Sequence, residues 1–166
     1  MSYSLVPLIS ALRAEDTASP AALALAECAR KIIFELIQAL SDGNVNVRNH
    51  AVSALGRICE VSKEIIPALI MVFTDEDEAV CECAAGALGK VGEPAIPALM
   101  EVLSDVDNQV RFYTVFALGW IASTPAVPAL IEVLNDADEA VSEIAEQALR
   151  EIGSTEALKA IRIIKS

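Results

Sequence analysis

The sequence predicts an all-α solenoid in which helix-turn-helix units are stacked end to end. Three observations predict it. Pro67, Pro97 and Pro128 stand 30 and 31 residues apart, so the chain repeats itself. Each proline is followed eight residues later by an aspartate and thirteen residues later by a valine. Within each unit the apolar residues recur every three or four positions, which is the spacing of one face of a helix.

Each repeat is predicted to contain a first helix of about ten residues and a second of about fifteen. The proline falls near the start of the first helix, where its missing N–H has no partner within the helix. An acidic turn follows, and its aspartates stand at the N-cap of the second helix: Asp77, Asp107 and Asp138. Gly92 and Gly153 suit the ends of second helices.

The whole chain, residues 1–166, is predicted to be one domain of about five units and a closing helix. We place the units at about 3–31, 32–63, 64–93, 94–124 and 125–153, and the capping helix at 154–166. In the degenerate first unit Pro20 opens the second helix. Neither Gly nor Pro occurs between Ala21 and Leu40, so the junction of the first two units is either a tight turn or one continuous helix.

Two runs carry a family resemblance: AAGALGKVG at residues 84–92 and PAIPAL at residues 94–99. They resemble the HEAT-like repeats named after phycobilisome lyases, over about residues 3–155. The resemblance implies a right-handed, HEAT/armadillo-like superhelix whose second helices line the concave side. Similar proteins include phycobilin lyase subunits, phycobilisome-degradation factors, hydroxylases and plain scaffolds, so the resemblance leaves the function open.

The charge balance bears on possible partners. The chain carries 24 acidic and 12 basic residues, a net charge of -12, which repels phosphate groups and argues against nucleic acid and anionic membranes. Apolar runs stay below the roughly 18 residues that span a bilayer, and the N-terminus lacks the pattern of a signal peptide. We therefore expect a cytoplasmic protein.

Few residues are suited to catalysis or to metal binding. The single histidine, His50, is expected to be a partly buried packing residue, and the His-Glu pairs of the iron-binding hydroxylases are absent. Cys81 and Cys83 point about 200° apart on a helix, which separates their thiols, although an iron–sulfur site stays an open alternative. We predict free thiols, no metal, no cofactor and no catalytic residue. The resemblance implies that Arg48 and Arg111 bind an acidic turn of an adjacent unit.

The fourth unit departs from the others by its aromatic residues. Four of the seven aromatic residues of the chain fall between positions 112 and 120. At 100° per residue, Phe112, Phe116 and Trp120 point about 175°, 145° and 105° away from the core. We expect these rings to be exposed on the concave face, and Trp120 to be the one that a neighbouring helix covers most easily. Packing between units and a homodimer are the alternatives.

These observations favour a non-enzymatic scaffold or adaptor that binds an apolar or aromatic segment of a protein partner with acidic flanks. The residues expected to bind the partner are Phe112, Phe116, Trp120, Tyr113, Arg57, Lys90 and Arg111. The alternative is a subunit of a phycobilin lyase or isomerase, or another phycobilisome-associated factor. It would stack a linear tetrapyrrole on the rings and pair its propionates with Arg57 or Arg111.

Overall fold

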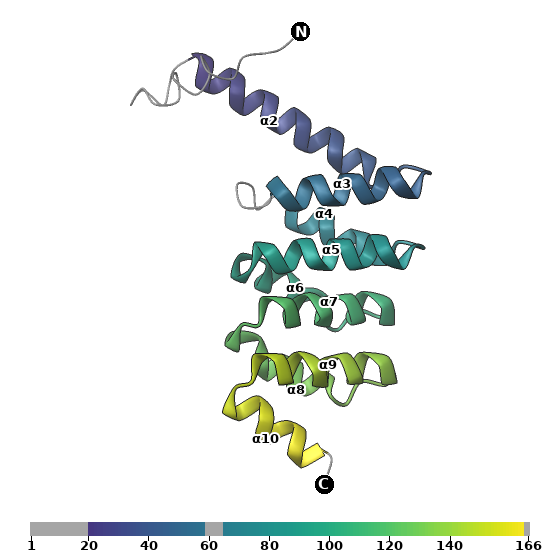
Figure 1. Cartoon of the computed structure of the whole chain (residues 1–166), viewed down its shortest axis with the longest axis vertical. Coiled ribbons are helices and arrows are strands. Elements are labelled where there is room, and N and C mark those ends of the chain that lie inside the picture. Colours follow the sequence, from purple (N-terminus) through teal and green to yellow (C-terminus); the bar gives the residue numbers. More distant parts are fainter. Residues whose placement is uncertain (1–19, 59–64, 165–166) are drawn as a thin grey trace.

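The computed structural model describes residues 20–58 and 65–164, and every regular element among them is helical. The α-helices are α2 (Pro20–Ala39), α3 (Val45–Ile58), α4 (Ile65–Met71), α5 (Glu78–Val91), α6 (Ile96–Val102), α7 (Asn108–Ile121), α8 (Val127–Val133), α9 (Glu139–Ile152) and α10 (Thr155–Ile164). Short 3-10 turns, Val72–Thr74, Glu93–Ala95 and Thr124–Ala126, follow α4 and precede α6 and α8. The helices α3, α5, α7 and α9 lie side by side in one row, with α4, α6 and α8 behind them (Figure 1). The predicted all-α solenoid is confirmed.

Helix α2 settles the junction that the sequence left open. It runs without a turn from Pro20 to Ala39, across the boundary we placed between residues 31 and 32. The first helix expected for unit one falls within residues 1–19, outside the described part of the chain. None of the described helices combines the length and the apolar character needed to cross a membrane.

The predicted caps are present at both ends of the second helices. The side chains of Asp77, Asp107 and Asp138 accept N–H groups from the first turns of α5, α7 and α9. At the other ends, Gly92 and Gly153 close α5 and α9 with φ of 74° and 64°, a region in which glycine carries no steric cost. The spacing of these residues therefore sets the lengths of α5 and α9, while α7 ends at Ala122, which takes a left-handed φ of 51°.

The core lies between the first and second helices. Leucines from both rows are fully buried: Leu55, Leu69, Leu88, Leu99, Leu118, Leu130 and Leu149. The second helices approach one another closely at glycines. A Cβ atom at Gly56 would lie 2.8 Å from the Cβ of Ala87, and one at Gly89 would lie 2.7 Å from the Cβ of Trp120. The stack therefore depends on glycine at these two contacts.

Arginine–aspartate pairs bind neighbouring units, as the resemblance implies. Arg48 donates to both carboxylate oxygens of Asp75, at 2.7 and 2.8 Å, and Arg111 does the same with Asp136, at 2.8 and 2.7 Å. Burial has the largest single effect on Asp75 and raises its pKa. The hydrogen bonds from Arg48, the backbone N–H of Asp77 and the charge of Arg48 together outweigh burial, so the pKa is lowered. The hydrogen bonds from Arg111 lower the pKa of Asp136. Both aspartates therefore stay charged.

Cys81 occupies the corresponding position in the unit between them. Its side chain is fully buried, and its sulfur lies 3.3 to 3.7 Å from the carbonyl oxygens of Val72, Phe73 and Asp75. The side-chain amide of Gln109 donates to two of these oxygens, those of Phe73 at 2.8 Å and Asp75 at 2.9 Å. Burial raises the pKa of the thiol to about 11, so Cys81 is protonated at neutral pH.

Candidate functional site

The aromatic residues of α7 form one continuous row of rings. Phe112 and Phe116 are stacked with their centroids 6.4 Å apart, and Trp120 meets Phe116 edge-on at 6.2 Å. Each of the three is one helical turn from the next, so the row follows the axis of α7. The rings support one another and give the row a fixed shape.

The exposure of the three rings is the reverse of what the helix geometry suggested. Trp120 is 59% exposed, whereas Phe112 and Phe116 are partly buried and packed against the core. A helical wheel gives the direction of the Cα–Cβ bond only, and a long ring can bend back along the helix surface. The Cβ of Trp120 does face α5, but it meets Gly89, which has no side chain to cover the indole.

Tyr113 lies in the interior rather than on the open face. Its side chain is 6% exposed and packs on Phe73 with the ring centroids 5.9 Å apart. Burial raises its pKa to about 12, and the nearby acidic groups of Cys81, Glu78 and Glu82 add to the effect. Tyr113 thus holds α7 against the preceding unit.

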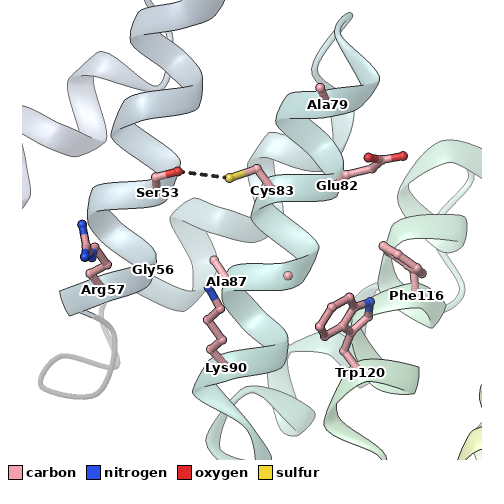
Figure 2. A pocket seen from close by; sticks show the side chains of 11 residues that line it. Ser53, Gly56, Arg57, Ala79, Glu82, Cys83, Ala87, Lys90, Phe116 and Trp120 are labelled. Carbon is pink, nitrogen blue, oxygen red and sulfur yellow. Dashed lines mark hydrogen bonds between the residues drawn. The ribbon is translucent and has the colours of Figure 1, made fainter.

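An open hollow of about 690 Å³ crosses the face of the second helices beside Trp120. Arg57 and Lys90 stand on one side of it, on α3 and α5, and Phe116 and Trp120 stand on the other, on α7 (Figure 2). Small residues form its floor, among them Ser53, Gly56, Ala79, Cys83, Gly86 and Ala87. Because these side chains are short, the hollow passes over α5 without interruption.

The basic residues expected at the site differ in their contacts. Arg57 and Lys90 are exposed, and neither forms an ion pair with another described residue. The guanidinium of Arg111 instead donates hydrogen bonds to the carboxylate of Asp136 and to the carbonyl oxygen of Asp105, 2.9 Å away. Arg57 and Lys90 are therefore available to a ligand, while Arg111 holds two units together.

A second hollow, of about 380 Å³, lies at the opposite end of the aromatic row. Its lining includes Phe112 and the acidic residues Glu78, Glu82 and Asp138. Glu82 lines both hollows, so they adjoin. The sequence analysis did not include these acidic residues in the site. The four-residue spacing of Glu78 and Glu82 along α5 was the signal that could have identified them.

The histidine and the cysteines of the described part of the chain do not come together in one site. His50 is exposed, so the expectation that it packs against the core is wrong. Cys83 lines the larger hollow, where its sulfur lies 3.4 Å from the Ser53 hydroxyl, and Cys28 is exposed on α2. Cys59 lies outside the described residues. Among those described, no group of three His, Cys, Asp or Glu side chains is placed to hold a metal ion.

Stacked helical hairpins with one open face of second helices define a repeat protein of the α-solenoid class. A family model described as HEAT repeats matches residues 33–109 and 96–164. The chain therefore belongs to the HEAT repeat family. The model describes HEAT repeats in general and does not distinguish the phycobilisome-lyase type.

Comparison with curated proteins finds no match. Among solved structures, the chain is similar to an engineered protein, with 23% identity over 96% of this chain and 84% of the other and a TM-score of 0.46. It is also similar to a designed armadillo repeat protein in complex with the peptide (KR)4, with 19% identity over 99% and 92% of the two chains and a TM-score of 0.42. At these identities the likeness concerns the fold alone.

Proposed function

We propose that this protein is a non-enzymatic interaction module that binds a peptide segment of a partner protein across the row of second helices. The segment lies in the larger hollow, between Arg57 and Lys90 on one side and Trp120 on the other. The observation that carries this proposal is the exposure of Trp120, 59%, at the wall of a hollow with a floor of small residues. A large, held and uncovered aromatic side chain beside a concave surface is the usual anchor of a protein interface.

The energetics agree with a role for Trp120 as an anchor. Aromatic side chains bury roughly 150 to 250 Å² each, so covering the exposed part of the indole removes roughly 100 to 150 Å² from water. At about 25 cal/mol per Å², this gives about 3 kcal/mol before the costs of association. Phe116 already holds the indole edge-on, so little side-chain entropy is lost when a ligand covers it.

A library of random peptides displayed on phage tests the proposal with the protein as it exists. Trp120 is the single tryptophan of the chain, so a peptide that covers it shifts the intrinsic fluorescence to shorter wavelength. We expect Trp120→Ala to weaken the selected peptides at least about tenfold, measured by the anisotropy of labelled peptide. Met71→Ala is the matched control, because it removes another exposed apolar side chain (76% exposed) from α4, outside this hollow.

Equal binding of the selected peptides to Trp120→Ala would contradict the proposal. Sedimentation of the protein alone gives a further test, because a homodimer that covers Trp120 would occupy the same surface. A visible chromophore that copurifies with the protein, or its transfer to an acceptor cysteine, would favour the phycobilin lyase alternative instead.

A further inference from the structure

The charge on the open face changes sign along α5. Glu78, Glu82, Gly86 and Lys90 follow one another at four-residue intervals, so they occupy one face of the helix, one in each turn. The face is acidic at the start of α5 and basic at its end. The rings of Phe112, Phe116 and Trp120 run in the same direction along the neighbouring helix α7, which lies beside α5 (Figure 1).

The two hollows lie at the two ends of this gradient. The larger one contains Arg57 and Lys90, and the smaller one contains Glu78 and Asp138. Glu82 lines both, and in Figure 2 its side chain extends from α5 toward α7, on the side of Phe116. A single bound segment can therefore enter both hollows while it crosses the rings.

The two ends of this face still differ in the sign of their charge when the charged residues of the neighbouring helices are counted. At the basic end the carboxylate of Glu151 lies near Gly119 and accepts a hydrogen bond from Gln147 at 3.1 Å, so it offsets part of the positive charge. At the acidic end Asp138 accepts hydrogen bonds from Asn108 and from the backbone of α9, which lower its pKa and keep it ionised. The ends therefore carry opposite net charge.

We propose that the ligand of this face is a peptide segment with opposite charges at its two ends. This inference rests on the proposed function and specifies its ligand. An acidic side chain lies beside Arg57 and Lys90, an apolar or aromatic one covers Trp120, and a basic one lies beside Glu82. Eight residues of helix separate Phe112 from Trp120, about 12 Å, which about four residues of extended peptide span. The acidic flanks expected from the sequence are thus replaced by one acidic and one basic flank.

Four synthetic peptides with one common apolar centre test this inference. Their flanks are acidic and basic, acidic at both ends, basic at both ends, or serine at both ends. By calorimetry we expect the mixed peptide to bind about three- to tenfold more tightly than the acidic or the serine peptide. The preference should shrink in high salt, which screens exposed charges. The basic peptide needs a further control, because any cation is attracted to a protein of net charge -12.

Charge-reversing variants provide that control. Lys90→Glu should weaken the mixed peptide by about three- to tenfold and strengthen the basic one, and Glu82→Lys should strengthen the acidic one. Lys159→Glu and Glu101→Lys make the same changes of net charge at exposed positions on α10 and α6. These two control variants should affect the basic and the acidic peptide only through the overall charge of the protein. They should not change which of the four peptides binds best. Melting curves by circular dichroism verify that all four variants are folded.

The inference and the proposed function fail in different ways. If all four peptides bind equally, or if Lys90→Glu and Lys159→Glu weaken the mixed peptide to the same extent, the opposite-charge inference is wrong. The proposed function stands in that case, provided that Trp120→Ala still loses binding. If none of the peptides shifts the tryptophan fluorescence, or if sedimentation shows a dimer that Trp120→Ala dissociates, both are overturned.

Discussion

Among the described residues, the second helices α3, α5, α7 and α9 meet at three junctions. The two outer junctions contain an ion pair, and none of the ion pairs in this part of the chain joins the middle one. Arg48 joins α3 to the turn before α5 through Asp75, and Arg111 joins α7 to the turn before α9 through Asp136. Between α5 and α7 the corresponding residue is Cys81. Gln109, at the start of α7, instead donates back to the carbonyl oxygens of Phe73 and Asp75 in the turn before α5. The same position in the repeat is therefore filled in two chemically different ways.

The middle junction replaces charge with ring packing. Phe73 and Tyr113 pack on each other there, whereas the other units have leucine at the position of Phe73: Leu40, Leu103 and Leu134. A buried ion pair is often no more stabilising than well-packed apolar residues of similar volume, so the exchange need not weaken the stack. The comparison indicates that the interface below the proposed binding face is held by apolar packing and by neutral hydrogen bonds.

The largest effect is expected when the ring packing of the middle junction is removed. Phe73 is fully buried, so Phe73→Ala should cost about 3 to 5 kcal/mol of the free energy of unfolding, through lost burial and the cavity left behind. Urea denaturation followed by circular dichroism measures it. Leu103→Ala, at the same position of the outer junction between α7 and α9, is the matched control and should cost less. A cost below about 1 kcal/mol for Phe73→Ala would mean that the rings do not hold this junction.

A smaller effect is expected when the missing arginine is introduced. Cys81→Arg alone should destabilise the protein by about 1 to 3 kcal/mol, because Gln109 lies 3.5 Å from the sulfur and leaves no room for a guanidinium. Gln109→Ala, which copies Ala79 and Ala140 of the units on either side, makes that room and lets the arginine reach Asp105. The free energy of unfolding of the double variant should be about 1 to 3 kcal/mol higher than the sum of the two single losses predicts. Additive free energies in the double-mutant cycle would show that the middle junction cannot accept an ion pair.

The stacking of the units could be predicted from the sequence because short-range patterns encode it. The aspartate caps, the closing glycines and the helix lengths depend on residues a few positions apart, and the repeat makes each of them visible several times. Helix α2 was different, because the absence of Gly and Pro permits a continuous helix without requiring one. Among its described side chains, only those of its second half pack on the core, through Ile33, Leu36 and Ile37, and the local sequence does not contain that packing.

The candidate site could be predicted only in part. The row of rings was visible because one unit departed from the others, but the exposure of Trp120 depends on Gly89, which lies 31 residues earlier on another helix. The charge gradient was missed because each residue of α5 was compared with its counterparts in other units. The opposite charges of Glu82 and Lys90 become apparent only when residues of the same helix are compared with one another, because the two lie about two turns apart on one face of α5.

The smallest effect is expected in the pH dependence of stability, which the two ion pairs influence at low pH. The ion pairs lower the pKa values of Asp75 and Asp136, so these groups add stability above the ordinary pKa of about 4 and lose it as the pH falls below that value. We expect Asp136→Asn to lower the urea midpoint at pH 7 by a few tenths of a molar, and by less at pH 3, because below the ordinary pKa the unfolded chain takes up the proton and the contribution of the ion pair shrinks. Asp105 is the matched control, because its carboxylate accepts the same backbone hydrogen bond, from Asp107, while Arg111 bonds only to its carbonyl oxygen. If Asp105→Asn showed the same loss with the same pH dependence, the arginine pairs would contribute nothing beyond the turn, and the outer junctions would be held like the middle one.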